Sequence, residues 1–114
     1  MAFLEIVQII MAVATILTGL FSLIRPLAVR GFTGLEPIGS RGISEIRSVL
    51  GGGFIGLGVA PLILAQPAAF QMLGIAYLTI GAARLLSIFF DKASVRSNWI
   101  SLAVEIVFGV VLVL

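Results

Sequence analysis

The sequence contains no cysteine and no histidine. Their absence excludes disulfides, thiolate nucleophiles, haem ligation by either residue and most zinc or copper sites. Charge is scarce as well, because charged residues make up 11% of the chain, against about 25% in soluble domains. A formal net charge of +2 gives no basis for nucleic-acid binding. The residues identify no catalytic group, metal site or cofactor.

Apolar residues are abundant instead. They make up 61% of the 114 residues, against roughly 45–50% in soluble domains. A water-soluble domain of this length could not hide so much apolar surface, because small domains leave a large share of their surface exposed. We therefore expect a single-domain integral membrane protein whose first partners are membrane lipids.

Four segments are long and apolar enough to cross the hydrocarbon core as helices, which takes about 20 residues. They cover roughly residues 3–24, 44–64, 68–90 and 97–114. The expected fold class is all-α, an integral membrane antiparallel four-helix bundle. The connection 25–43 is broken by prolines and glycines, so we expect no regular helix there. Positive charges follow the first apolar run and do not precede it, which favours a retained helix over a signal peptide.

The basic residues indicate an orientation. All but one of them fall in or beside the first and third connections, at Arg25, Arg30, Arg41, Arg47, Lys92 and Arg96. With four spans, these two connections lie on the same side of the membrane. Short loops rich in Lys and Arg stay in the cytoplasm, so both termini are predicted to face outward.

Gly51, Gly53 and Gly56 match G-x-G-x-x-G, the dinucleotide-binding fingerprint. That fingerprint needs a preceding strand, a following helix in a βαβ unit and an acidic residue about 20 positions later. Here the run Glu45-Ile46-Arg47 precedes the glycines, no strand pattern is near, and no acidic residue follows before Asp91. The pattern therefore does not predict a phosphate site.

Close packing of membrane helices explains the glycines better, because small residues let helix backbones approach in lipid. Gly52, Gly56 and Ala60 recur every four residues and are predicted to form the packing stripe, widened by Gly51 and Gly58. The other three helices also carry a small or polar stripe, predicted to face inward. These stripes are Glu5, Gln8, Ala12, Thr15, Gly19 and Ser22; Gly74, Tyr77, Gly81, Arg84, Ile88 and Asp91; and Asn98, Ser101, Glu105 and Gly109.

Two charges fall within predicted spans, where charge is costly and is usually paired or functional. Arg84 and Glu105 lie at similar depths, roughly 9–12 Å from the cytoplasmic end of their helices at 1.5 Å per residue. We expect them to meet within a cytoplasm-facing polar pocket. The predicted pocket consists of Glu45, Arg47, Arg84, Ser87, Asp91, Ser101 and Glu105.

Three interpretations of this cluster stay open. It could be a mutually neutralising network that fixes helix register, or a small polar pocket for a ligand, a lipid headgroup or an ion. Catalysis by two carboxylates is the third, although no nucleophile accompanies them.

The residues also carry a family resemblance. The run Arg41…Ser44-Glu45-Ile46-Arg47…Gly51-Gly52, followed by Gly56 and Gly58, resembles the core of the DUF4345 family, as do Ala83-Arg84, Ser87, Asp91 and Glu105. The resemblance implies a small four-helix protein of the bacterial cytoplasmic (inner) membrane and supplies no activity or cofactor. Leu50 departs from the pattern, because an aromatic residue is expected there.

The leading functional hypothesis is a non-enzymatic scaffold or accessory subunit of a membrane assembly, with other membrane-protein subunits or further copies of the chain as partners. The alternative is a binder or carrier of a small ligand or lipid through the Arg84/Glu105 pocket.

The charge pattern yields a topology prediction. A reporter inserted at Gly39 should be cytoplasmic, and a reporter fused after Leu114 should be external, because the basic connections stay inside. Protease or thiol accessibility of the two reporters in intact cells measures this. A cytoplasmic C-terminal reporter would reverse the orientation and place the Arg84/Glu105 pocket on the outer side.

Overall fold

The computed structural model describes residues 2–114; most of these are helical and none of them forms a strand. Four helical stretches are long and apolar enough to cross a membrane. They are α1 (Ala2–Ile24); one continuous helix made of α3 (Gly39–Glu45), the π-helical η2 (Ile46–Gly52) and α4 (Gly53–Leu64); α5 (Pro67–Phe90); and α6 (Arg96–Val113).

The first connection is more ordered than its composition suggested. It contains a 3₁₀ turn, η1 (Pro26–Val29), and the short helix α2 (Arg30–Thr33), so the expectation of no regular helix was wrong. Proline opens η1 because its fixed φ suits a first helical position. Gly34 ends α2 with a φ of 75°, a left-handed conformation that favours glycine. The second long helix then begins at Gly39.

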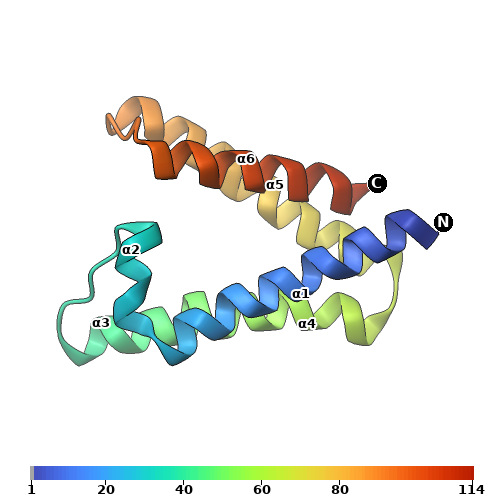
Figure 1. Cartoon of the computed structure of the whole chain (residues 1–114), viewed down its shortest axis with the longest axis horizontal. Helices are drawn as coiled ribbons and strands as arrows, with labels where there is room; N and C mark the ends of the chain where they lie inside the picture. The colour runs from blue at the N-terminus through green and yellow to red at the C-terminus, as the bar shows by residue number, and fades with distance from the viewer. Residues whose placement is uncertain (1) are drawn as a thin grey trace.

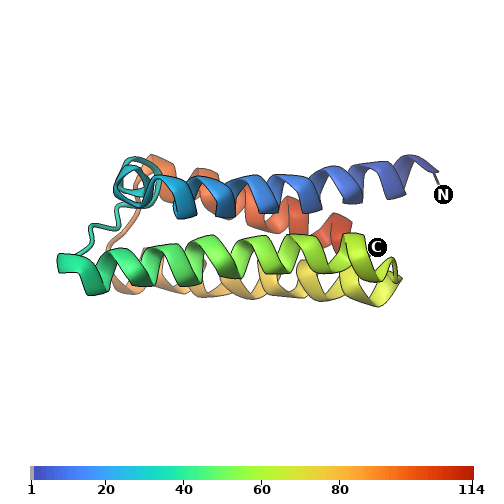
Figure 2. The same ribbon diagram turned by 90° about the horizontal axis from the view of Figure 1, so that it is seen from below.

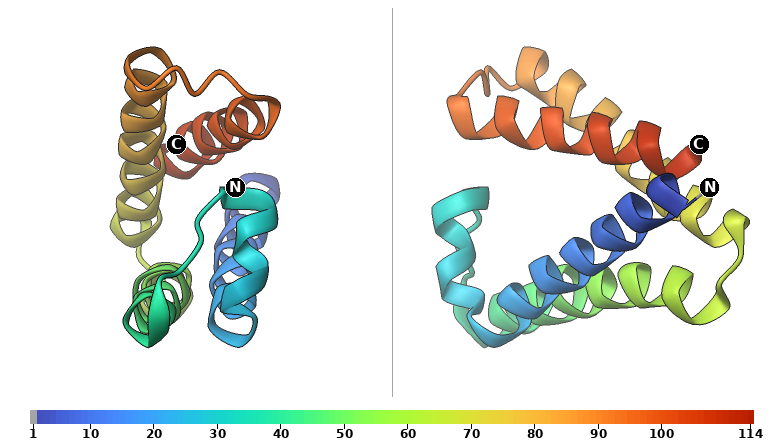
Figure 3. Two further views of the ribbon diagram at one scale, coloured as in Figure 1. Left: turned by 90° about the vertical axis from the view of Figure 1, so that its left-hand side faces the viewer. Right: turned by 45° about the vertical axis from the view of Figure 1, so that its right-hand side comes forward.

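The four long helices form two pairs. α1 packs along η2 and α4, α5 packs along α6, and contacts between the pairs are far fewer. Helices that follow one another run in opposite directions (Figure 1). The pairs meet near the two termini and diverge toward the opposite end, where α2 lies (Figures 1 and 3). Figure 2 also shows both termini at one end of the molecule and the first connection at the other. The compact bundle expected from the sequence is therefore opened at one end.

Glycine brings the backbones of α1 and α4 into contact. A Cβ atom on Gly58 would lie 2.6 Å from the carbonyl oxygen of Ala12, and one on Gly19 would lie 2.6 Å from that of Gly51. Real Cβ atoms do not approach that closely, so both positions require glycine. This is the packing by which membrane helices associate, since lipid offers no hydrophobic drive to push them together.

Glycine also brings the backbones of the second pair, α5 and α6, into contact. A Cβ atom on Gly74 of α5 would lie 2.9 Å from the carbonyl oxygen of Gly109 on α6. Both glycines are buried, together with Gly81 on the same face of α5. Each pair is therefore held by backbone contact at a glycine on both of its helices.

The stripe predicted for the second long helix lies outside this interface. A Cβ atom on Gly56 would meet nothing within 4 Å, and one on Gly52 would meet nothing closer than 3.9 Å; Ala60 is half-buried. α1 packs instead on the face that carries Gly51 and Gly58, the two glycines predicted only to widen the stripe. The inward stripes predicted for α1, α5 and α6 are confirmed in part. Their buried members are Ala12, Thr15, Gly19, Ser22, Gly74, Tyr77, Gly81, Ile88, Glu105 and Gly109. Gln8, Arg84, Asn98 and Ser101 are half-buried, whereas Glu5 and Asp91, near the helix ends, are exposed.

The pairs are joined by a small apolar cluster near the termini and by two hydrogen bonds. The cluster consists of Met11, Ala12, Leu73, Tyr77 and Leu112. The Thr15 hydroxyl donates its one proton to the carbonyl oxygen of Met11 at 2.8 Å, so the Tyr77 hydroxyl, 2.5 Å away, donates to Thr15. Gln8 Nε2 donates to the carbonyl oxygen of Val111 at 2.9 Å. We call this meeting point the apex.

The glycine contacts predict opposite responses to adding one methyl group. Gly58→Ala should lower the free energy of unfolding by about 1–3 kcal/mol, the usual cost of overpacking a tight contact. Gly56→Ala should leave stability unchanged or raise it by up to about 1 kcal/mol, because alanine favours helix over glycine. Unfolding of both variants in the same mild detergent measures this. Equal losses would mean that the face carrying Gly56 also packs.

Candidate functional site

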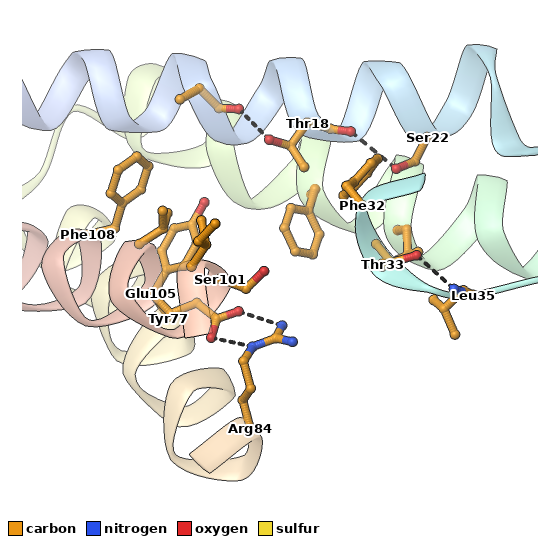
Figure 4. Close-up of a pocket in the computed structure, with 15 residues that line it drawn as sticks. Thr18, Ser22, Phe32, Thr33, Leu35, Tyr77, Arg84, Ser101, Glu105 and Phe108 are labelled. Atoms are coloured by element: carbon orange, nitrogen blue, oxygen red, sulfur yellow. Dashed lines mark hydrogen bonds and ion pairs between the residues drawn. The ribbon is translucent and has the colours of Figure 1, made fainter. Parts of the chain in front are cut away.

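A cavity of about 520 Å³ lies between the two helix pairs, on the side where they diverge (Figure 4). Every long helix contributes to its wall, and so does the first connection. Most of the wall is apolar and is formed by Phe32, Leu35, Leu50, Phe54, Ile100, Val104 and Phe108. Leu50, the position where the sequence departs from the resembled family, is thus part of this wall.

The short helix α2 closes part of the wide end. Phe32 and Thr33 of α2 and Leu35 after it line the cavity, and α2 contacts α6 across the gap between the pairs. The ring of Phe32 packs on Phe21 of α1, with 5.5 Å between ring centroids. The ordered connection that the sequence did not predict is therefore one wall of the site.

An ion pair between α5 and α6 forms the polar part of the wall. Arg84 Nε donates to Glu105 Oε1 at 2.8 Å, and Arg84 Nη2 donates to Glu105 Oε2 at 2.7 Å (Figure 4). This two-point fork is the strongest geometry for an arginine and a carboxylate. The Arg84 side chain is 29% exposed and that of Glu105 is 10% exposed. The predicted meeting of these two charges is confirmed.

The turn between α5 and α6 explains why they meet. α5 ends at Phe90 and α6 begins at Arg96, so a short turn reverses the chain. Lys92 takes a left-handed φ of 54° within that turn. Arg84 precedes the turn by about two helical turns and Glu105 follows it by slightly more, which places both at the same level.

Asn98 completes the network and was not among the predicted pocket residues. Arg84 Nη1 donates to Asn98 Oδ1 at 2.7 Å, and Asn98 Nδ2 donates to the carbonyl oxygen of Ala93 at 3.0 Å. Asn98 therefore ties the ion pair to the α5–α6 turn. Asn98 could have been assigned to the pocket from the sequence, because it lies seven residues before Glu105. That spacing places both residues on one face of α6.

Of the predicted pocket, the structure brings together Arg84, Ser101 and Glu105, which all line the cavity. The other four residues lie elsewhere. Ser87 donates to Asp91 Oδ2 at 2.6 Å on the exposed end of α5.

Glu45 and Arg47 belong to the other helix pair. Glu45 pairs with Arg41 at 3.2 Å in an exposed contact along α3, and Arg47 has no hydrogen-bond or ion-pair partner within residues 2–114. The two pairs diverge at this end (Figure 1). Similar depth along the helices therefore did not bring Glu45 and Arg47 to Arg84.

Three further hydroxyl groups line the cavity, but their protons are already engaged. Thr18 donates to the carbonyl oxygen of Ala14, Ser22 to that of Thr18, and Thr33 to that of Val29, at 2.9, 3.2 and 2.7 Å. These hydroxyls can still accept a hydrogen bond but have no proton left to donate.

Aromatic side chains define the end of the cavity nearest the apex. The rings of Tyr77 and Phe108 pack edge to face with centroids 5.3 Å apart, and both line the cavity. The site thus has an aromatic end and a polar end. Within residues 2–114, no group of three or more acidic side chains could hold a metal ion.

Comparison with known families agrees with the resemblance drawn from the sequence. The model of the family described as a domain of unknown function (DUF4345) matches residues 3–114. The chain belongs to the DUF4345 family. No curated protein and no solved structure matches it. The cavity and its side chains are therefore the features of this DUF4345 chain that bear on its function.

The ion pair predicts strong coupling between its partners. Glu105→Ala should lower the free energy of unfolding by roughly 3–5 kcal/mol, because it leaves the guanidinium of Arg84 uncompensated in a low-dielectric interior. Arg84→Met combined with Glu105→Leu should recover much of that loss. Unfolding in mild detergent measures both.

The exposed pair of Arg41 and Glu45 supplies the matched control. Glu45→Ala should change stability by no more than about 1 kcal/mol, the usual range for an exposed ion pair. If the losses from Arg84→Met and Glu105→Leu simply added in the double variant, the two residues would not be coupled.

Proposed function

We propose that this DUF4345 protein is an integral membrane protein that binds a small, largely apolar molecule between its two helix pairs. The cavity carries the proposal. Its volume of about 520 Å³ lies within the roughly 300–1,000 Å³ of small-molecule sites. It also has their usual composition, an apolar wall with a few polar groups that can fix orientation.

The distribution of apolar side chains supports placement in a membrane. Large apolar side chains are exposed along all four long helices; Phe3, Ile63 and Phe90 are 75%, 74% and 81% exposed. Such surfaces are stable when lipid surrounds them and aggregate in water. The basic connections lie at one end of the molecule and both termini at the other (Figure 1). We place the basic end in the cytoplasm of a bacterium, by the charge rule for short loops.

A scaffold or accessory-subunit role remains the competing proposal. Its support is the outward apolar surface, but lipid accounts for that surface equally well. A scaffold has no need for a cavity to which five separate segments contribute. The cavity therefore favours binding of a ligand or lipid, the role that the sequence ranked second.

A cavity-filling substitution tests the proposal. Val104 lines the cavity and is 44% exposed, so Val104→Trp should occupy the space without disturbing the packing. Val110, also on α6 and 47% exposed, lies outside the cavity wall, and Val110→Trp is the matched control. Native mass spectrometry of protein purified in mild detergent should find a small molecule on the parent and on Val110→Trp, and none on Val104→Trp.

The same measurement can contradict the proposal. A bare chain in all three proteins, or a bound molecule that Val104→Trp retains, would rule out the cavity as a binding site. A partner subunit or a fixed multiple of the chain with nothing small attached would favour the scaffold.

A further inference from the structure

The charges and hydrogen-bond donors of the cavity specify what it would hold. We infer that its occupant is a neutral amphiphile, an apolar chain that ends in an uncharged hydrogen-bond acceptor such as a hydroxyl, ketone or ester oxygen. This inference rests on the proposed function, because it names the ligand class of the same site.

Charge balance excludes a charged headgroup as the best fit. The charged side chains that line the cavity are Arg84 and Glu105, and they neutralise each other through two short hydrogen bonds. An anion would have to lie beside the Glu105 carboxylate and compete with it for Arg84. A cation would have to lie beside the Arg84 guanidinium and compete with it for Glu105. In a low-dielectric site either arrangement leaves a charge uncompensated, which is costly.

The donor inventory indicates an acceptor. A guanidinium has five N–H donors, and three of those on Arg84 are engaged, two with Glu105 and one with Asn98. Two remain. The hydroxyl of Ser101, which lines the cavity, has no hydrogen-bond partner within residues 2–114. The spare donors at the polar end therefore come from Arg84 and Ser101, and an uncharged oxygen satisfies them without disturbing the ion pair.

The cavity also sets the orientation of the chain. α5 runs from the apex toward the wide end, so Tyr77 lies roughly 10 Å nearer the apex than Arg84. Phe54, Val104 and Phe108 line the wall, and Figure 4 shows Phe108 well separated from Arg84. The polar group would bind at the wide end, with the apolar chain directed toward Tyr77.

Three probes with one chain length test the inference. They are tetradecanol, tetradecyl sulfate and tetradecylamine, which are neutral, anionic and cationic at neutral pH. Each is added at a low mole fraction to phosphatidylcholine nanodiscs with and without the protein, and the excess binding over empty discs is measured. Tetradecanol should bind at least about tenfold more tightly than either ion, the ratio expected when one buried group is left unpaired.

A variant that unbalances the ion pair tests whether its neutrality is the reason that the cavity prefers an uncharged ligand. Glu105→Gln keeps the shape of the side chain and removes its charge, which leaves Arg84 as an uncompensated cation. The order of affinity should then reverse, with tetradecyl sulfate bound more tightly than tetradecanol. Glu45→Gln makes the same change in net charge outside the cavity and should keep the parent order. Val104→Trp should abolish excess binding of every probe.

The outcomes separate this inference from the proposed function. If no probe shows excess binding to the parent protein, the proposed function fails. If tetradecyl sulfate or tetradecylamine binds the parent as tightly as tetradecanol does, and Val104→Trp abolishes that binding, the site stands and the neutral-ligand inference is wrong. The parent protein alone decides this, even if Glu105→Gln does not fold.

Discussion

The hydrogen bond between Tyr77 and Thr15 is the constraint on which the rest of the arrangement depends. In the membrane that we propose for this chain, lipid does not force helix pairs together, because lipid tails are as apolar as the side chains that face them. The pairs therefore need specific links, and the apex supplies this one, a second from Gln8 to Val111, and a small apolar cluster. Contacts between the pairs are few elsewhere. The join at one end is what leaves room for a cavity at the other.

The cavity and the ion pair support each other. A charge pair is stable inside a membrane protein only if its geometry is good and its remaining polar atoms are satisfied. Glu105 receives both fork donors of Arg84, and Asn98 anchors a third donor to the α5–α6 turn. No buried side-chain nitrogen or oxygen within residues 2–114 lacks a partner. The site is thus preorganised, and its spare donors belong to Arg84 and Ser101, which both line the cavity.

Much of this could be predicted from local pattern, and the remainder could not. Periodicity and length identified the long helices, and depth along a hairpin was enough to pair Arg84 with Glu105. Depth alone failed for Glu45, because it takes no account of the splay between the pairs. Spacing could not show which glycines of the widened stripe meet α1, since all of them suit close packing and only the partner helix selects the face. The glycines and prolines of the first connection predicted no regular helix there, and α2 was missed. The same residues that break helices also start and end short ones.

The glycine contacts within each pair have a mechanical consequence. The helix backbones approach closely at Gly58 and at Gly74, and such close packing resists sliding of one helix along its partner. A change in the width of the cavity would therefore require rotation of one pair against the other at the apex, and a small rotation there would give a larger displacement at the wide end. Distances between spin labels on α2 and on the α5–α6 turn would report that motion. A substitution at Thr15 would thus alter the cavity from a distance, because it removes a hydrogen bond that joins the two pairs at the apex.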